Sequence, residues 1–366
     1  MGTDSAKRLR LALLLGGRSP EHDVSLASAR SVYNALDPLR FDVVPMAIGQ
    51  DGRWLPAGMS QALLTSGVQG DEADVVQSTA LVPDASIGST VDVVFPLLHG
   101  PFGEDGTVQG LLELLGVPYV GAGVAASAVG MDKALMKSLF AQAGLPVLNY
   151  AVVRAAQWER DRIGVSRRLS EVPGFPCFVK PANMGSSVGV SRCDGPDDLV
   201  TALDRAFAYD LKVLVEKGVP GYREIECGIL GNEEPRASVP GEIIVSGEFY
   251  DYHAKYTDGV ARLQIPADVR PETARAIRLI ALQSFSAIDA AGMARVDFLV
   301  SQDESEIWLS EINTIPGFTP LSMYPLLWQA SGVPYAELIN QLVELALERH
   351  AAKARLNRNR LPGEDA

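Results

Sequence analysis

The chain has 366 residues, 47% of them hydrophobic and 21% charged, which is the composition of an ordinary globular protein. This length suffices for two or three domains with a sizeable core. The formal net charge of −13 disfavours nucleic-acid binding, because an acidic surface repels phosphate backbones. We expect neither a membrane span of ~20 apolar residues nor a secretory signal. The three cysteines, an odd number, argue against a disulfide framework, so a cytoplasmic enzyme is predicted.

The first third of the chain alternates apolar runs with helical patterns, which indicates an α/β layer. Strands are expected over residues 9–15, 41–48, 91–98 and 117–120. Helices are expected over residues 25–36, with Ser25 as the N-cap, and over residues 107–115.

The remaining two thirds mix both periodicities. Helices are expected over residues 131–143, 197–209, 271–291 and between 322 and 352. Strands are expected over residues 176–180, 188–193, 213–217, 224–230, 294–300 and 306–312. Residues 246–266 lack a clear period, which is typical of a functional loop. We predict a fold of α/β and α+β class with domains over 1–130, 131–222 and 223–353 and a disordered tail over 354–366.

Gly16 and Gly17 follow the first strand and precede a helix, as in dinucleotide-binding folds. That fingerprint needs three spaced glycines, and Glu21 and Asp23 in the same loop would repel a pyrophosphate, so the NAD signal is weak. A carboxylate at the carboxyl end of a parallel sheet instead suits an ammonium group. Taken alone, Glu21 could equally be an acid in the first turn of a helix.

A second loop, residues 99–106, contains one histidine, two acids and three glycines. Glycines let the backbone approach a ligand closely, and His99 could orient an acid or accept a proton. An ordinary glycine-rich turn with solvated acids explains the loop about as well.

Lys180 ends a predicted strand and is followed by a Gly/Ser loop over residues 183–189. A lysine with exposed backbone N–H groups and hydroxyls, such as that of Ser187, suits phosphate oxygens. The lysine precedes the loop and no helix follows, so this is not a Walker A motif. Lys133 is a second candidate cation. For either lysine alone, a surface position is the default expectation.

The segment from Glu216 to Val219 passes from a strand into a linker. Such a crossing can present backbone groups to adenine and a carboxylate to its amino group, and Glu224 could reach a ribose hydroxyl. A charged edge at a domain boundary is an equally good interpretation without the other motifs.

Two late strands carry the most informative spacing. A period of two places Arg295 with Asp297 on one face and Glu311 with Asn313 on one face. If the strands pair, two carboxylates and one amide oxygen converge, a donor set that suits Mg²⁺. The alternative is a pair of salt-bridged strands on the surface. It is disfavoured because the opposite faces of both strands are apolar, which implies that the polar faces line a cleft. The Gly317 N–H could serve an oxyanion beside Arg295.

Together these residues resemble the ATP-grasp superfamily and, in detail, the D-alanine–D-alanine ligases. The matching segments are residues 15–25, 99–106, 131–133, 179–190, 250–256, 295–297 and 311–317. They occur in the family's order over nearly the whole chain. The resemblance implies a three-domain ATP-grasp architecture with an N-terminal parallel-sheet α/β domain.

The resemblance also implies roles for individual residues. The first D-alanine would bind Glu21, Ser186 and Tyr256, and the second would lie near His99, Glu104, Ser322 and Met323. ATP would bind Lys133, Lys180, Ser187, Glu216, Lys217, Val219, Glu224 and Lys255, the last from a mobile lid over residues 246–266. Two Mg²⁺ or Mn²⁺ ions would bind Asp297, Glu311 and Asn313, while Arg295 and Gly317 would stabilise an oxyanion. A homodimer without nucleic-acid or membrane partners is implied.

Three alternatives remain beside an ATP-dependent ligase of two D-alanines for peptidoglycan precursors. D-alanine–D-lactate and D-alanine–D-serine ligases resemble the chain but replace the lid tyrosine, so Tyr256 favours the dipeptide ligase. Other ATP-grasp carboxylate–amine ligases would share the magnesium and lysine motifs but not residues 21–25 and 99–106 together. A non-catalytic nucleotide-binding module would not need the set of Arg295, Asp297, Glu311 and Asn313.

Overall fold

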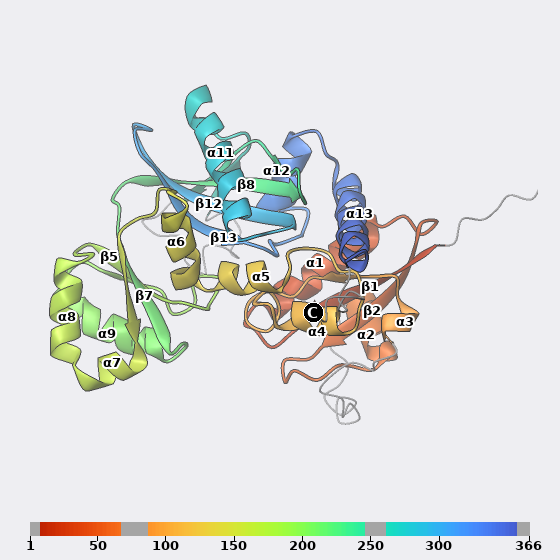
Figure 1. Ribbon diagram of the computed structural model, residues 1–366, viewed down its shortest axis with the longest axis horizontal. Coiled ribbons are helices and arrows are strands. Elements are labelled where there is room, and N and C mark those ends of the chain that lie inside the picture. The colour runs from red at the N-terminus through yellow and green to blue at the C-terminus, as the bar shows by residue number, and fades with distance from the viewer. Residues whose placement is uncertain (1–7, 67–86, 246–260, 357–366) are drawn as a thin grey trace, which may run out of the picture.

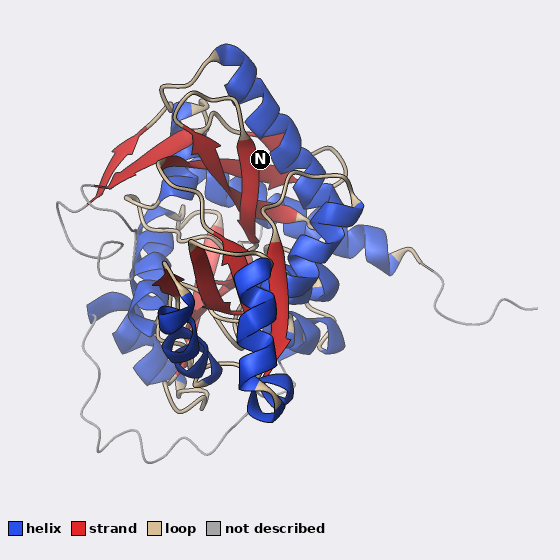
Figure 2. Ribbon diagram, turned by 90° about the vertical axis from the view of Figure 1, so that its left-hand side faces the viewer, coloured by secondary structure: helices blue, strands red, loops and turns tan. Residues whose placement is uncertain are grey.

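The computed structural model describes residues 8–66, 87–245 and 261–356. Three sheets lie in chain order, and Figure 1 shows each in its own part of the molecule. In Figure 2 the helices, in blue, lie mostly around the strands. This mixed architecture with an N-terminal parallel sheet agrees with the predicted fold class.

The N-terminal sheet has β1 (Leu9–Gly16) between β2 (Phe41–Ile48) and β3 (Val93–Pro96), all parallel. Alternate residues of β1 feed two apolar cores, because successive side chains point to opposite faces. Leu13 packs in one core with the C-terminal helix, and Leu14 packs in the other with α4 (Thr107–Leu114). The other helices of this region are α1 (His22–Ala35), α2 (Ala57–Ser66) and α3 (Ile87–Thr90).

Two expectations for this region were wrong. Helix α1 begins at His22, with Glu21 at the N-cap position, rather than at Ser25. The Ser25 hydroxyl donates to Leu97 O at 2.5 Å and accepts from Gly16 N at 2.8 Å, so it joins the ends of β1 and β3 instead of capping a helix. Residues 117–120 form only an isolated bridge, between Tyr119 and Val94, because the chain passes the edge of β3 without continuing the ladder.

The helix expected over residues 131–143 is α6 (Lys133–Gln142), and a helix that was not expected, α5 (Val124–Met131), precedes it. Asp132 separates them in an extended conformation, and its carboxylate accepts hydrogen bonds from Ala134 N and Leu135 N as the N-cap of α6. Figure 1 shows α5 and α6 running between the part with α1–α4 and the part with α7–α9.

The second sheet is antiparallel in the order β4-β7-β5-β6. Its strands are β4 (Tyr150–Arg154), β5 (Cys177–Pro181), β6 (Ser191–Cys193) and β7 (Lys212–Lys217), covered by α7 (Ala155–Arg160), α8 (Arg162–Glu171) and α9 (Pro196–Phe207). Leu199 and Leu203 of α9 pack on this sheet because they are one turn apart on its apolar face. The Gly/Ser segment joins β5 to β6, as predicted.

The third sheet is antiparallel in the order β11-β10-β8-β12-β13, with β9 paired to β8. Its strands are β8 (Tyr222–Gly231), β9 (Arg236–Ala237), β10 (Gly241–Val245), β11 (Ala261–Gln264), β12 (Gly292–Ser301) and β13 (Ile307–Asn313). Helix α11 (Pro271–Ala287) packs on one face, as does α6 through Met136 and Phe140. Of the loop expected over residues 246–266, residues 246–260 lie outside the described chain and residues 261–264 form β11 instead of a loop, because they pair with β10.

Helices α12 (Met323–Ala330) and α13 (Tyr335–Ala354) end the described chain. Leu338 and Leu342 of α13 are fully buried in the core that also holds Leu13 of β1, so the C-terminal helix covers the N-terminal sheet. The predicted tail from 354 begins where α13 ends, and residues 357–366 lie outside the described chain. No helix in the described ranges is long and apolar enough to cross a membrane. The division into domains at 130 and 222 stays a prediction.

Candidate active site

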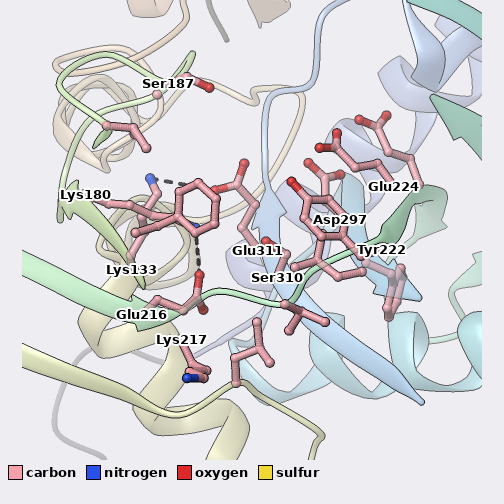
Figure 3. A pocket seen from close by; sticks show the side chains of 18 of the residues that line it. Lys133, Lys180, Ser187, Glu216, Lys217, Tyr222, Glu224, Asp297, Ser310 and Glu311 are labelled. Atoms are coloured by element: carbon pink, nitrogen blue, oxygen red, sulfur yellow. Dashed lines mark hydrogen bonds and ion pairs between the residues drawn. The ribbon is translucent and has the colours of Figure 1, made fainter. Parts of the chain in front are cut away.

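A cavity lies between the second and third sheets, and seven of the acidic and basic side chains predicted for the site line it. Figure 3 shows lysines on one side of this cavity and Asp297 and Glu224 on the other, with Glu311 between them. The lining residues predicted from the sequence are Lys133, Lys180, Ser186, Ser187, Glu216, Lys217, Val219, Glu224, Asp297 and Glu311. Ten residues from both halves of the chain therefore meet at one place.

Lys133 and Lys180 supply positive charge to the cavity from two different elements. Lys133 begins α6 and donates to Met184 O at 2.7 Å, and its Nζ lies 3.7 Å from Glu311 Oε2. Lys180 lies near the end of β5 and donates to Glu216 Oε2 at 2.7 Å. The two ammonium groups thus flank the start of the Gly/Ser loop, where phosphate oxygens could be neutralised.

Glu216 on β7 is the most buried acid of the cavity, with 2% of its side chain exposed. Its Oε2 accepts from Lys180, and its Oε1 contacts the equally buried Lys137 of α6. Burial would raise the pKa of Glu216, but the two lysines outweigh it and lower the pKa to about 2. Sequence reasoning missed Lys137, although its position one helical turn after Lys133 was a usable signal.

The Gly/Ser loop has a strained, anchored backbone. Ser186 and Ser187 have positive φ values of 50° and 58°, a conformation that residues other than glycine seldom adopt. Asp210 anchors the start of the loop, because its Oδ2 accepts from Asn183 N at 2.7 Å and Asn183 Nδ2 at 2.8 Å. The loop therefore presents its backbone in a fixed shape, as an anion-binding loop requires.

The predicted hairpin of β12 and β13 exists, and Asp297 lies directly opposite Glu311 in its register. Next to this pair, the alternation of side chains along β13 is interrupted. Ser310 is an extra residue, so Leu309 and Ile312, three positions apart, both point to the core. This bulge lets Ser310 and Glu311 both line the cavity. The sequence pattern gave the strands but not the bulge.

Asp297, Glu311 and Asn313 provide only hard oxygen donors, which fits Mg²⁺ or Mn²⁺ better than a softer metal. In the described chain no group of three or more histidine, cysteine or acidic side chains forms a metal site, so any site here has two acids and an amide. Asn313 Oδ1 accepts from Ile315 N at 3.0 Å, and Asn313 itself is absent from the residues that line the cavity. The two facing carboxylates are thus the better-placed donors.

Arg295 pairs with Asp297 of this donor set and with Glu226 of β8. Its Nε and Nη2 donate to the two oxygens of Asp297, each at 2.7 Å, and its Nε lies 2.9 Å from Glu226 Oε2. Burial would lower the pKa of the guanidinium, but these acids raise it. Glu226 was not predicted, since only the pairing of β8 with β12 brings it opposite Asp297.

The N-terminal loops reach the Gly/Ser loop at Glu21. Ser186 Oγ donates to Glu21 Oε1 across 165 positions of sequence. A Cβ added at Gly100 would lie 2.8 Å from Glu21 Oε2, and one added at Gly185 would lie 3.1 Å from it. Three loops from two sheets therefore converge on one carboxylate, and glycine is needed where they approach most closely.

His99 and Glu104 are buried beside Glu21. His99 Nδ1 lies 3.1 Å from Ile315 O, and burial lowers the pKa of the imidazole despite the nearby Glu21. Glu104 Oε1 accepts from Gly100 N at 2.8 Å. Burial, and then the charge of Glu21, raise the pKa of Glu104 from 4.5 to about 8, so it is protonated at neutral pH.

This protonated acid predicts a pH-dependent stability. As the pH rises from about 4.5 to 8, the unfolded chain ionises Glu104 while the folded chain keeps it neutral, so the wild type loses stability. E104Q is neutral throughout. We expect the unfolding free energy of E104Q relative to wild type to grow over this range by on the order of 3 kcal/mol, measured by urea unfolding at several pH values. Parallel pH profiles for the two proteins, with the exposed E306Q as a control, would contradict the shift.

Ser322 and Met323, two of the residues predicted to bind the second substrate, lie at the start of α12. Ser322 is its N-cap residue, and its Oγ accepts from Thr319 N at 3.0 Å. A Cβ added at Gly317 would lie 3.1 Å from Ser322 Oγ, so the two predicted positions are adjacent. Met323 is buried against Ile243 and Leu327, so only its backbone suits a substrate contact.

Further polar and aromatic groups complete the lining of the cavity. Lys217 donates from Nζ to Phe175 O at 2.6 Å, which points its ammonium away from Glu216. Glu224 and Tyr222 of β8 line the side of the cavity opposite the lysines. Phe178 of β5 lines the cavity beside Lys180, whose Nζ lies 5.8 Å from the centre of its ring. Phe178 and Tyr222 were not predicted and offer flat faces to a planar base. Lys255 and Tyr256 lie outside the described residues.

Two family profiles match the chain, "D-ala D-ala ligase N-terminus" over residues 10–122 and "D-ala D-ala ligase C-terminus" over residues 139–344. The chain belongs to the D-alanine–D-alanine ligase family. It is 51% identical to a D-alanine–D-alanine ligase of Geobacillus thermodenitrificans over 362 residues, covering 94% of this chain and 97% of that protein. A ligase of the same name from Deinococcus radiodurans is 48% identical over 93% of this chain and 98% of that protein.

Solved structures of the family have the same fold. The D-alanine–D-alanine ligase of Coxiella burnetii superposes with a TM-score of 0.82 at 36% identity, over 96% of this chain and 97% of that one. The VanG D-Ala:D-Ser ligase of Enterococcus faecalis superposes with a TM-score of 0.78 at 32% identity, over 93% of this chain and 100% of that one. The ATP-grasp fold predicted from the sequence is thereby confirmed.

Proposed function

We propose that this ligase joins two D-alanine molecules into D-alanyl-D-alanine, converts ATP to ADP and phosphate, and so supplies peptidoglycan synthesis. The observation that carries the proposal is the contact of Ser186 with Glu21. It places a carboxylate suited to the ammonium group of an amino acid beside a loop suited to phosphates. The carboxylate of the first D-alanine and the γ-phosphate of ATP would therefore meet between these two loops.

In the first step, a carboxylate oxygen of D-alanine attacks the γ-phosphorus, and the bond from that phosphorus to the β–γ bridging oxygen breaks. Lys133 and Lys180 hold the phosphates and offset their charge. Divalent cations bound by Asp297, Glu311 and Asn313 would neutralise the charge on the transferring group. The products of this step are ADP and an acyl phosphate, which is a better electrophile than a carboxylate.

In the second step, the amine of the second D-alanine attacks the acyl carbon, phosphate leaves and the amine loses a proton. Arg295 and the Gly317 N–H stabilise the tetrahedral oxyanion. The Asp297 and Glu226 contacts use Nε and Nη2 of Arg295, and they orient its guanidinium for this role. Ser322 and the Met323 N–H would receive the carboxylate of the second substrate.

The assay that tests this function supplies purified enzyme with D-alanine, ATP and Mg²⁺. We expect phosphate release matched one to one by dipeptide, detected by mass spectrometry, and no turnover with L-alanine. Omitting Mg²⁺ should stop the reaction, and Mn²⁺ should replace it. Turnover of another amino acid beside inert D-alanine would reassign the substrate.

The second candidate activity transfers D-alanine to D-lactate or D-serine. The D-Ala:D-Ser ligase among the structural relatives makes this the alternative to exclude. Tyr256 favours D-alanine as the second substrate. In a competition assay with equal D-alanine, D-lactate and D-serine, the dipeptide should dominate. We further propose that the enzyme is a homodimer and acts in the cytoplasm, where ATP is available.

A further inference from the structure

Lys137 is a fully buried lysine whose ammonium contacts Glu216, the acid of the cavity that is predicted to accept from the amino group of adenine. Only 1% of the residue is exposed, and Nζ contacts Glu216 Oε1. The neighbours of Lys137 on the buried side of α6 are apolar, such as Met136 and Phe140. Burying an ammonium among them is costly, and burial lowers the pKa of Lys137. Packing alone would be better served by methionine.

Lys137 does not reach the nucleotide cavity itself. The cavity is lined by Glu216 and Lys180, whereas Lys137 is absent from its lining. The two lysines hold opposite oxygens of one carboxylate, Lys137 at Oε1 and Lys180 at Oε2. Lys137 can therefore act on a bound nucleotide only through Glu216.

We propose that Lys137 is a positioning residue that keeps the Glu216 carboxylate charged and in place when Lys180 turns to the phosphates of ATP. The inference rests on the proposed nucleotide site, in which Lys180 binds phosphate and Glu216 accepts from the amino group of adenine. Both roles require the contact between Lys180 Nζ and Glu216 Oε2 to loosen. A carboxylate with 2% exposure would then be left without a counter-charge, were it not for Lys137.

The same geometry explains why one lysine would not suffice. If Lys180 alone neutralised Glu216, each ATP molecule that drew Lys180 away would leave a buried carboxylate without a counter-charge, which weakens binding. With Lys137 at Oε1, the three groups carry a net charge of about +1, so a positive charge remains for the phosphates after Glu216 is neutralised. Lys137 thus frees Lys180 for the nucleotide.

A double-mutant cycle tests this role. The dissociation constant of ADP with Mg²⁺ is measured by calorimetry for wild type, K137M, E216Q and K137M/E216Q. We expect K137M to weaken ADP binding about tenfold or more when Glu216 is present and less than about threefold in the E216Q background. In steady state, KM for ATP should rise in K137M more than kcat falls. K137R, which keeps the cation, should bind ADP more tightly than K137M.

Two further variants keep the test decisive. K353M breaks the ion pair between Lys353 of α13 and Glu113 of α4, which both lie outside the cavity lining, and should leave ADP binding unchanged. If K137M does not fold, K137Q takes its place in the cycle, because glutamine also removes the positive charge from Glu216 and its polar amide is easier to bury beside a carboxylate. Equal losses in both backgrounds would assign Lys137 to packing and overturn the proposal, as would unchanged ADP binding in K137M. A wild-type protein that binds no ADP would instead refute the proposed nucleotide site.

Discussion

E311Q should abolish ligation while leaving the protein folded. Glu311 faces Asp297 across the hairpin and lies 3.7 Å from Lys133, so it belongs to both the acidic and the basic side of the cavity. Glutamine keeps its shape and one oxygen but loses the charge that a divalent cation requires. We expect kcat for phosphate release to fall about a thousandfold or more. With 36% of this side chain exposed, the unfolding free energy should change by less than about 1 kcal/mol.

The matched control is E306Q, which removes an exposed acid just before the same strand. Its turnover should equal that of wild type. Mn²⁺ titration followed by electron paramagnetic resonance separates metal loss from other causes, because E311Q should bind Mn²⁺ more weakly while E306Q should not. Retained turnover or unchanged Mn²⁺ affinity in E311Q would remove Glu311 from the metal site.

R295K should lower kcat strongly while it changes KM for ATP little. Arg295 sits between Asp297 and Glu226, and its side chain is 17% exposed. Lysine retains one positive charge for the two acids but loses the planar fork that orients donors towards both an acid and an oxyanion. We expect kcat to fall about 100- to 1000-fold, which is the usual effect of removing one oxyanion donor. KM for ATP should stay within about threefold of wild type.

R223K is the matched control, because it also replaces the planar guanidinium of a similarly buried arginine with an ammonium group. Arg223 on β8 is 14% exposed, pairs with Glu242 through Nε and Nη2, and lies outside the cavity lining. Both variants should lose stability, on the order of 1–2 kcal/mol by urea unfolding. Only R295K should lose turnover. If R223K lost as much kcat as R295K, a general structural effect would explain both results.

The sequence was informative where residues of a functional type also occur at the regular spacing of a strand. Strand spacing around Asp297 and Glu311 predicted the hairpin, and the register places these acids opposite each other. The lysine before a Gly/Ser loop predicted a loop between two strands near the cavity, where Lys180 lies. These predictions succeed because a local pattern fixes both the element and the direction of its side chains.

Other features left no local signal. Glu226 and Lys137 look like ordinary charged residues on a strand and a helix, and their partners are 69 or more positions away in the sequence. Ser25 resembles a helix cap, yet its hydroxyl bonds to the ends of β1 and β3. The bulge at Ser310 also depends on how β13 pairs with β12. Each outcome was set by a neighbour brought close by folding, which competes with local preference.

The amino-acid order by itself determined the family, the order of the elements and the chemical character of the site, because these follow from residue types at short, regular spacings. Tertiary structure alone decided which charges meet. It joined Ser186 to Glu21 and enclosed Glu216 between two lysines. The physical reason is that the energy of a charge depends on its burial and its partners, and both are created only when distant segments pack together.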